Sequence, residues 1–100
     1  MNKLLVAILL SFAAVTVGAA EQAMQDRYQK SCFACHGFGA NGAPRTGVAA
    51  DWAPRMQKGM ATLVKHTSEG FNSMPPKGLC FDCSDDDFKA LIEFMATPKS

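Results

Sequence analysis

The chain has 100 residues, which is enough for a single domain. Ten lysines and arginines stand against nine aspartates and glutamates, so the formal charge is close to neutral. Nucleic-acid binding calls for a clear basic excess, and we therefore expect no nucleic-acid partner.

The first twenty residues differ from the rest of the chain. Lys3 gives a positive start, residues 4–15 are almost unbroken apolar sequence, and small residues at 18–20 precede Glu21. This layout is typical of a secretory signal peptide, so we predict a signal at 1–20 with cleavage after Ala20 and export to the periplasm. The apolar run is shorter than the roughly twenty residues of a spanning helix, and we expect no stable membrane insertion after cleavage. An uncleaved anchor stays open as the alternative.

The mature chain is then a single domain at 21–100. Without Lys3, nine basic residues balance nine acidic ones, and the formal charge is zero. A domain of this size lies near the lower limit for a self-sufficient core, so a disulfide or a bound cofactor is expected to support it. The four cysteines could supply both.

The segment 21–31 is predicted to be the first helix. Met24, Tyr28 and Cys32 recur every four residues, which is one stripe of an α-helix, and polar residues fill the other face. This helix leads directly into the first cysteine pair.

The middle of the chain is predicted to form two short helices. Pro54 suits the first turn of a helix, Gly59 interrupts the apolar pattern, and Gly70 is a plausible stop. Apolar residues continue the helical spacing between these points, namely Met56, Met60, Leu63 and Val64.

The last helix is predicted over 85–96. Ser84 and Asp87 resemble a capping box at its start, and Pro98 follows its end. Four apolar residues share one face and are expected to be core: Phe88, Leu91, Ile92 and Met95. No segment shows sustained alternation with a period of two, so the sequence predicts an all-α protein.

Residues 32–36 read Cys-Phe-Ala-Cys-His and carry the strongest chemical signal. This C-x-x-C-H arrangement is typical of covalent haem c attachment, with Cys32 and Cys35 forming thioethers and His36 as the proximal iron ligand. A thiol–disulfide oxidoreductase would need a βαβ pattern, which is absent. A zinc site made of all four cysteines is disfavoured by the long gap between the two pairs.

The second axial ligand is predicted to be Met74. It lies in a loop directly before Pro75 and Pro76, which fix successive φ angles and stiffen the segment. His66 is the rival ligand, but its polar surroundings favour a solvated surface histidine. Methionine–histidine ligation leaves no open iron position and so favours an electron carrier over an enzyme.

Cys80 and Cys83 form the second pair, and Ser84 stands where a haem motif would have histidine. A second haem is therefore not expected. In an oxidising compartment the natural prediction is a Cys80–Cys83 disulfide, with a catalytic thiol pair as the alternative.

Three further residues have two interpretations each. Trp52 either packs in the core or donates its indole N–H to a haem propionate. Arg45 and Arg55 either neutralise propionates or face water, and we favour water for at least one of them.

With these motifs the chain resembles the small class I c-type cytochromes, and most closely the cytochrome c5 group. Residues 42–44 (Gly-Ala-Pro) resemble the family's turn on the histidine side, which implies that the Pro44 carbonyl accepts a hydrogen bond from His36. The run 74–85 is similar to the family's segment that carries the axial methionine and a disulfide. The resemblance therefore also implies Met74 as ligand and a Cys80–Cys83 bridge. Phe71 is bulkier than the pattern suggests.

The resemblance implies a class I cytochrome c fold, with three to five helices around one covalently bound haem. The expected function is that of a periplasmic monohaem electron carrier between respiratory partners, a donor complex on one side and a terminal oxidase or reductase on the other. The alternatives are a haem-based sensor or peroxidase-like protein with a displaceable sixth ligand, and a thiol-redox module that uses Cys80 and Cys83.

Overall fold

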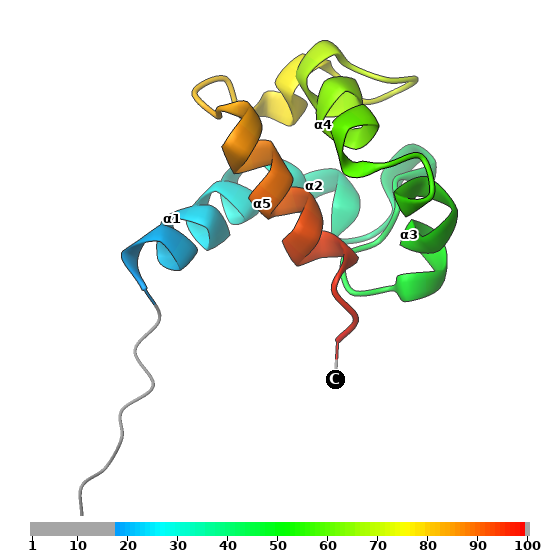
Figure 1. The fold of residues 1–100 in the computed structure, drawn as a ribbon, viewed down its shortest axis with the longest axis horizontal. Coiled ribbons are helices and arrows are strands. Elements are labelled where there is room, and N and C mark those ends of the chain that lie inside the picture. Colours follow the sequence, from blue (N-terminus) through cyan, green and yellow to red (C-terminus); the bar gives the residue numbers. More distant parts are fainter. Residues whose placement is uncertain (1–17, 100) are drawn as a thin grey trace, which may run out of the picture.

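The computed structural model describes residues 18–99, and the helices of this part of the chain enclose one core (Figure 1). Five α-helices are present in it, which agrees with the predicted all-α class: α1 (Ala19–Arg27), α2 (Phe33–His36), α3 (Ala49–Met56), α4 (Met60–Glu69) and α5 (Asp85–Ala96). One π-helical turn, Tyr28–Cys32, and two 3₁₀ turns, Ala40–Gly42 and Pro76–Leu79, complete the helical elements. None of the helices described is long and apolar enough to cross a membrane. The predicted signal peptide falls mostly on residues 1–17, which lie outside the described part.

The predicted first helix is longer than expected. It begins at Ala19 and runs through α1, the π-helical turn and α2 to His36. Within the wide turn the Phe33 N–H bonds to the Tyr28 carbonyl, five residues back. The cysteine motif is therefore part of a helix rather than a segment that follows one.

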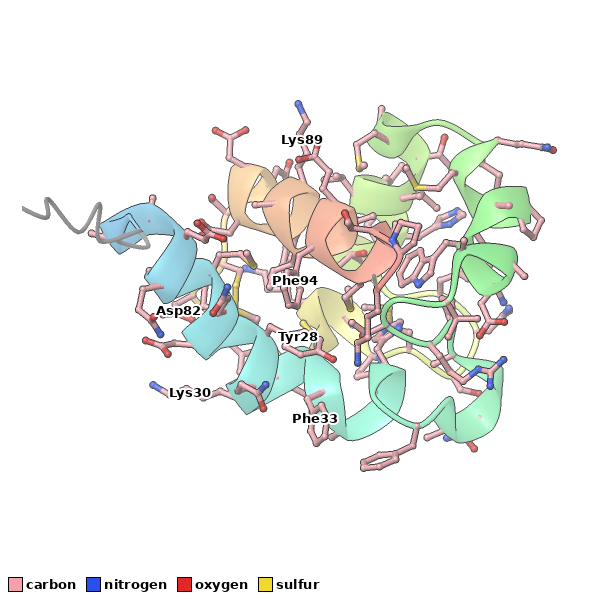
Figure 2. All side chains as sticks on the ribbon, turned by 90° about the horizontal axis from the view of Figure 1, so that it is seen from below. Tyr28, Lys30, Phe33, Asp82, Lys89 and Phe94 are labelled. Carbon is pink, nitrogen blue, oxygen red and sulfur yellow. A yellow bond between two sulfur atoms is a disulfide. The ribbon has the colours of Figure 1, made fainter. Side chains whose placement is uncertain are left out.

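The continuous helix packs against α5 through aromatic side chains (Figures 1 and 2). The Tyr28 ring is buried and meets the Phe94 ring edge-on, with centroids 4.9 Å apart. Its hydroxyl also donates to Thr46 Oγ1 at 2.8 Å, so a buried polar atom is satisfied. This contact joins both helices to the loop after α2.

Helix α5 has the predicted bounds and the predicted core face. The Asp87 N–H donates to Ser84 Oγ at 3.2 Å and the Ser84 N–H donates to the Asp87 carboxylate at 2.9 Å, which completes the capping box. The four predicted core residues, Phe88, Leu91, Ile92 and Met95, are all buried. Burial of side chains of this size contributes about 1.5–3 kcal/mol each.

The middle region forms two helices as predicted, but the position of Pro54 differs from the prediction. Helix α3 begins at Ala49, so Pro54 lies inside the helix and not in its first turn. Pro54 has no backbone N–H, so the Ala50 carbonyl lacks its helical hydrogen-bond partner. The loss of helix stability is limited because α3 has only eight residues and only this one bond is removed. Gly59 separates α3 from α4, and Gly70 ends α4; both have φ of 91°.

Candidate functional site

One cleft, with a volume of about 200 Å³, brings together the residues that the sequence singled out. Cys32, Cys35, His36 and Met74 all line it. They reach it from two separate segments, the helical C-x-x-C-H motif and the loop before the 3₁₀ turn Pro76–Leu79. Apolar side chains of the core form its floor: Leu63, Phe88, Leu91, Ile92 and Met95.

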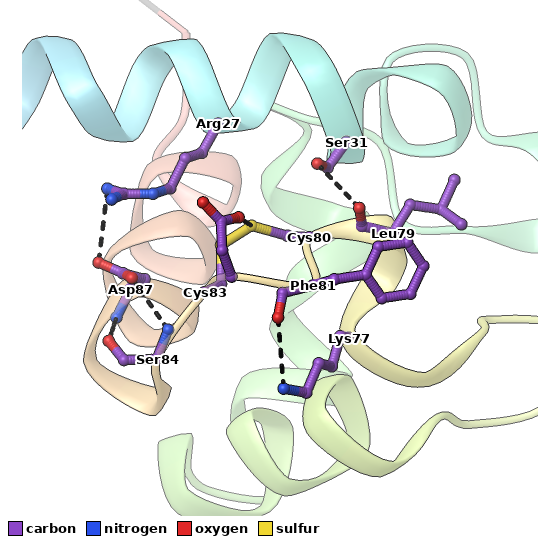
Figure 3. The surroundings of a disulfide bond; sticks show 10 residues. Arg27, Ser31, Lys77, Leu79, Cys80, Phe81, Cys83, Ser84 and Asp87 are labelled. Atoms are coloured by element: carbon purple, nitrogen blue, oxygen red, sulfur yellow. Dashed lines mark hydrogen bonds and ion pairs between the residues drawn. A yellow bond between two sulfur atoms is a disulfide. The ribbon is translucent and has the colours of Figure 1, made fainter.

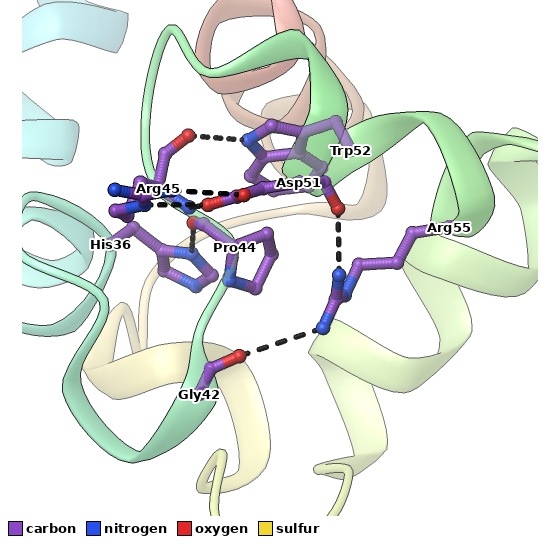
Figure 4. Close-up of polar contacts among 7 residues, drawn as sticks. All are labelled: His36, Gly42, Pro44, Arg45, Asp51, Trp52 and Arg55. Atoms are coloured by element: carbon purple, nitrogen blue, oxygen red, sulfur yellow. Dashed lines mark hydrogen bonds and ion pairs between the residues drawn. The ribbon is translucent and has the colours of Figure 1, made fainter.

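His36 is buried, with 8% of its surface exposed, and its orientation is fixed (Figure 4). Its Nδ1 lies 2.8 Å from the Pro44 carbonyl oxygen. A carbonyl can only accept, so Nδ1 carries the proton and Nε2 keeps a free lone pair for a metal. Burial lowers the pKa of His36, the hydrogen bond to Pro44 opposes this, and the positive charge of Arg55 lowers the pKa further.

The loop that carries Pro44 is fixed by the start of α3. The Arg45 guanidinium pairs with the Asp51 carboxylate at 2.8 and 3.2 Å, and the Arg45 backbone N–H adds a third bond at 3.1 Å. These bonds from Arg45 lower the pKa of Asp51 to about 2. The Trp52 Nε1–H donates to the Arg45 carbonyl at 2.9 Å, and the Thr46 N–H donates to the His36 carbonyl at 2.8 Å.

Trp52, Arg45 and Arg55 differ in what they offer the cleft. Trp52 is buried, lies stacked on His36 with ring centroids 5.7 Å apart, and uses its indole N–H within the protein. Arg45 is bound to Asp51 and does not line the cleft. Arg55 lines it, and among the described residues its guanidinium donates to two backbone carbonyls, those of Asp51 at 2.6 Å and Gly42 at 3.5 Å (Figure 4).

Cys32 and Cys35 are free thiols at the cleft. They are three residues apart in one helical segment, and this spacing places them on the same face. Burial raises the pKa of Cys32 to about 11, so the group is a neutral thiol at physiological pH. Such a thiol does not have the lowered pKa of a catalytic cysteine.

Met74 is held in a series of tight turns. Phe71 and Met74 exchange two backbone hydrogen bonds of 3.0 and 2.9 Å, and the Gly78 N–H donates to the Pro75 carbonyl at 3.0 Å. A Cβ added to Gly78 would lie 2.9 Å from Met74 Cε, so the absence of a side chain at Gly78 leaves room for the methionine. Together with two consecutive prolines, these turns hold the thioether with little freedom.

A disulfide between Cys80 and Cys83 follows the methionine loop (Figure 3). Its Cα atoms are 5.4 Å apart, both residues are buried, and the Cys83 N–H also donates to the Cys80 carbonyl at 3.2 Å. The bridge ends directly before Ser84, which caps α5. It therefore connects the methionine loop to the last helix. The side chain of Ser31 reaches the Leu79 carbonyl from the other side at 3.5 Å.

His66 is not the solvated surface residue that the sequence predicted. Its ring is half-buried, lies flat on the Phe71 ring with centroids 4.0 Å apart and an interplanar angle of 10°, and lines the cleft. The polar neighbours in sequence were misleading because α4 turns this one side chain towards the segment that follows Gly70. Phe71, five residues further along the chain, is the one sequence feature that could have indicated a partner for the His66 ring.

The residues present fit a covalently attached haem c. Two thiols on one helical face, an imidazole whose Nδ1 is already bonded and a thioether in a rigid loop are the donors that such a group requires. The apolar side chains that line the cleft suit a porphyrin ring. Arg55, which also lines the cleft, suits the negatively charged haem propionates.

Comparison with known proteins shows which family the chain resembles. Residues 19–95 match the family described as cytochrome C oxidase, cbb3-type, subunit III. The chain is 40% identical to cytochrome c5 of Ectopseudomonas mendocina over 85 residues, which covers 83% of this chain and 98% of that protein. It is 42% identical to cytochrome c5 of Azotobacter vinelandii over 81 residues, covering 79% and 98% of the two chains.

Two solved structures have a similar fold. A mono-heme ferrocytochrome c from Shewanella putrefaciens superposes with a TM-score of 0.67 at 49% identity, covering 76% of this chain and 94% of the other. A structure of the electron transfer complex of nitrite reductase with cytochrome c also contains a match. Its TM-score is 0.67 at 26% identity, with coverage of 81% of this chain and 95% of the other.

Proposed function

Because the chain belongs to the cytochrome c5 family of monohaem c-type cytochromes, we propose that it shuttles single electrons between respiratory partners in the periplasm. Members of this family bind one covalent haem c with iron, and they belong to the electron carriers. The bound haem supplies the redox chemistry, a one-electron change at its iron. The proposed partners are a donor complex and a terminal oxidase or reductase.

We assign four residues to the haem. Cys32 and Cys35 hold it through thioethers, His36 ligates the iron through Nε2, and Met74 ligates it through sulfur. The observation that carries this assignment is the hydrogen bond from His36 Nδ1 to the Pro44 carbonyl, which leaves the lone pair of Nε2 available to a metal. The His36 ring lines the same cleft as Met74. An oriented ring binds metal without an ordering cost.

Ligands on both faces favour electron transfer over catalysis. The tight turns around Met74 and the buried ring of His36 keep both ligands in place, so little structure has to move when the charge changes. A closed site also offers no position where a substrate could bind and be activated. These features support a carrier over a sensor or a peroxidase-like protein.

Of the two arginines, Arg55 and not Arg45 is placed to neutralise a haem propionate. Arg55 lines the cleft and has no carboxylate partner among the described residues, whereas Arg45 is occupied by Asp51. Trp52 donates to the Arg45 carbonyl and so supports the loop rather than a propionate.

The ferric absorption spectrum tests the assignment. We expect a far-red charge-transfer band typical of sulfur–iron(III) ligation, lost in Met74→Ala and kept in the control Met56→Ala, whose side chain is exposed on α3. Met74→Ala should also bind cyanide readily. A wild-type protein without the band, which binds cyanide or carbon monoxide at neutral pH, would instead establish the sensor or peroxidase alternative.

Two further measurements test the finer proposals. Mass spectrometry of protein from the periplasmic fraction should show a chain that begins at Glu21 and carries one haem. A thiol titration of that protein in denaturant should find no reactive thiol, because Cys80 and Cys83 are bonded to each other. Two reactive thiols would favour the thiol-redox module.

A further inference from the structure

The lining of the cleft includes a pair of stacked rings with a cation beside it. The rings of His66 and Phe71 lie parallel, 4.0 Å apart, and the Lys58 ammonium sits 5.2 Å from the centroid of the Phe71 ring. All three residues line the cleft. They come from three segments: the link between α3 and α4, the last turn of α4, and the loop after Gly70.

Phe71 is also the residue on which the backbone of Met74 depends. The two residues exchange both backbone hydrogen bonds, so the turn from 71 to 74 closes on itself. Asn72, inside the turn, has a left-handed φ of 51°, and Gly70, before it, has a φ of 91°. Glycine and asparagine are the residue types that adopt such a backbone most readily in a turn. A movement of Phe71 therefore moves Met74 with it.

Burial alone does not fix the position of Phe71. The residue is 42% exposed, so a large part of its surface stays in contact with water. The contacts that remain are directional: the flat imidazole on the ring and the cation beside it. These contacts are what holds this end of the turn against α4.

We propose that Phe71 is a positioning residue for Met74 and that His66 supports it, so that the stacked pair keeps the turn closed and the sulfur on the iron. This inference rests on the proposed ligand role of Met74. An outside ligand can reach the iron only when the turn opens, and loss of the stack increases the fraction of open protein.

The test is the rate of cyanide binding to the ferric holoprotein at fixed pH. Phe71→Leu and His66→Ala should each accelerate binding by about 2- to 12-fold, the factor that corresponds to the usual strength of an aromatic pair. Phe71→Tyr and His66→Phe keep two stacked rings and should stay within about twofold of wild type. Phe38→Leu is the matched control, since Phe38 is 75% exposed and does not line the cleft.

A double variant separates positioning from a general loss of stability. Because the two rings form one contact, Phe71→Leu and His66→Ala together should accelerate cyanide binding no more than either alone. Additive effects, or unchanged binding rates in both single variants, would overturn the inference. A His66→Phe variant that behaves like His66→Ala would overturn it as well, since then the imidazole itself and not its stacking matters.

The result remains distinct from a failure of the proposed function. If Met74→Ala loses the far-red band and binds cyanide while Phe71→Leu does not change the rate, the ligand assignment stands and only the positioning role is wrong. If Met74→Ala leaves the wild-type spectrum unchanged, Met74 is not the ligand, and both proposals are wrong.

Discussion

The Nδ1 atom of His36 lies 2.8 Å from the carbonyl oxygen of Pro44, eight residues along the chain. Donation of this N–H makes the imidazole a stronger electron donor to a metal at Nε2, which favours the ferric state. Pro44→Ala keeps the carbonyl but releases its backbone, so the bond should weaken and the reduction potential should rise. The shift should not exceed about 40 mV, because one hydrogen bond contributes about 1 kcal/mol net.

Voltammetry of the purified holoprotein measures this shift. Pro98→Ala is the control, because Pro98 is exposed beyond the end of α5. A fall in potential for Pro44→Ala, or an equal shift in the control, would contradict the role of the Pro44 carbonyl.

The Arg45–Asp51 pair predicts a pH-dependent contribution to stability. The bonds from Arg45 lower the pKa of Asp51 from 3.8 to about 2, so the carboxylate binds protons less readily in the folded chain than in the unfolded one. Its contribution is then fully present above pH 3.8 and is lost as the pH falls towards 2. Asp51→Asn should be less stable than wild type at neutral pH, and the difference should shrink to nothing through this window.

Urea unfolding of both proteins at a series of pH values measures that difference. Glu93→Gln serves as the control because Glu93 is exposed and its side chain forms no ion pair among the described residues. Its difference from wild type should stay flat over the same range. A constant deficit in Asp51→Asn would mean that the charge of Asp51 is not what stabilises the loop.

Trp52 is predicted to act through its hydrogen bond to Arg45. Trp52→Phe keeps an aromatic ring but leaves the Arg45 carbonyl without the donor that now lies 2.9 Å away. Because that carbonyl still accepts from the Val48 N–H at 3.2 Å, the free energy of unfolding should fall by about 0.5–1.5 kcal/mol, the net value of one hydrogen bond. Denaturant unfolding of the holoprotein measures the loss, and Phe81→Leu, at an exposed position, should change the free energy of unfolding by less than about 0.5 kcal/mol.

The same variant decides between the two interpretations of the indole. If the Trp52 N–H holds a propionate in the loaded protein, Trp52→Phe will change how the reduction potential varies with pH. We expect that pH profile to keep its shape.

The helix boundaries and motifs that could be predicted from the sequence are those that depend on residues close together along the chain. Helix α5 was placed correctly because its start depends on Ser84 and Asp87, three residues apart, and its face on a regular spacing. Gly59 and Gly70 separated and ended the middle helices because their φ angles disfavour any other residue. The C-x-x-C-H motif predicts haem attachment on the same kind of ground, since its residues are neighbours along the chain.

The features that sequence missed depend on contacts between segments. The wide turn at Tyr28 accompanies ring contacts with α5, and the start of α3 before Pro54 is pinned by Arg45. His66 was expected in solvent because its partner, Phe71, lies across a glycine bend. No periodic pattern in the sequence encodes any of these contacts.

Gly78 should be required for the position of Met74 rather than only for the turn. Ala at this site meets two obstacles: a φ of 53°, and a Cβ 2.9 Å from Met74 Cε. Gly42 is a matched control, since its φ is 79° but a Cβ there has no heavy atom within 4 Å. Both Gly78→Ala and Gly42→Ala should lose about 1–2 kcal/mol from the left-handed backbone. Only Gly78→Ala should also weaken the far-red ferric band, because only there must the thioether move; equal bands in the two variants would mean that Gly78 leaves the sulfur in place.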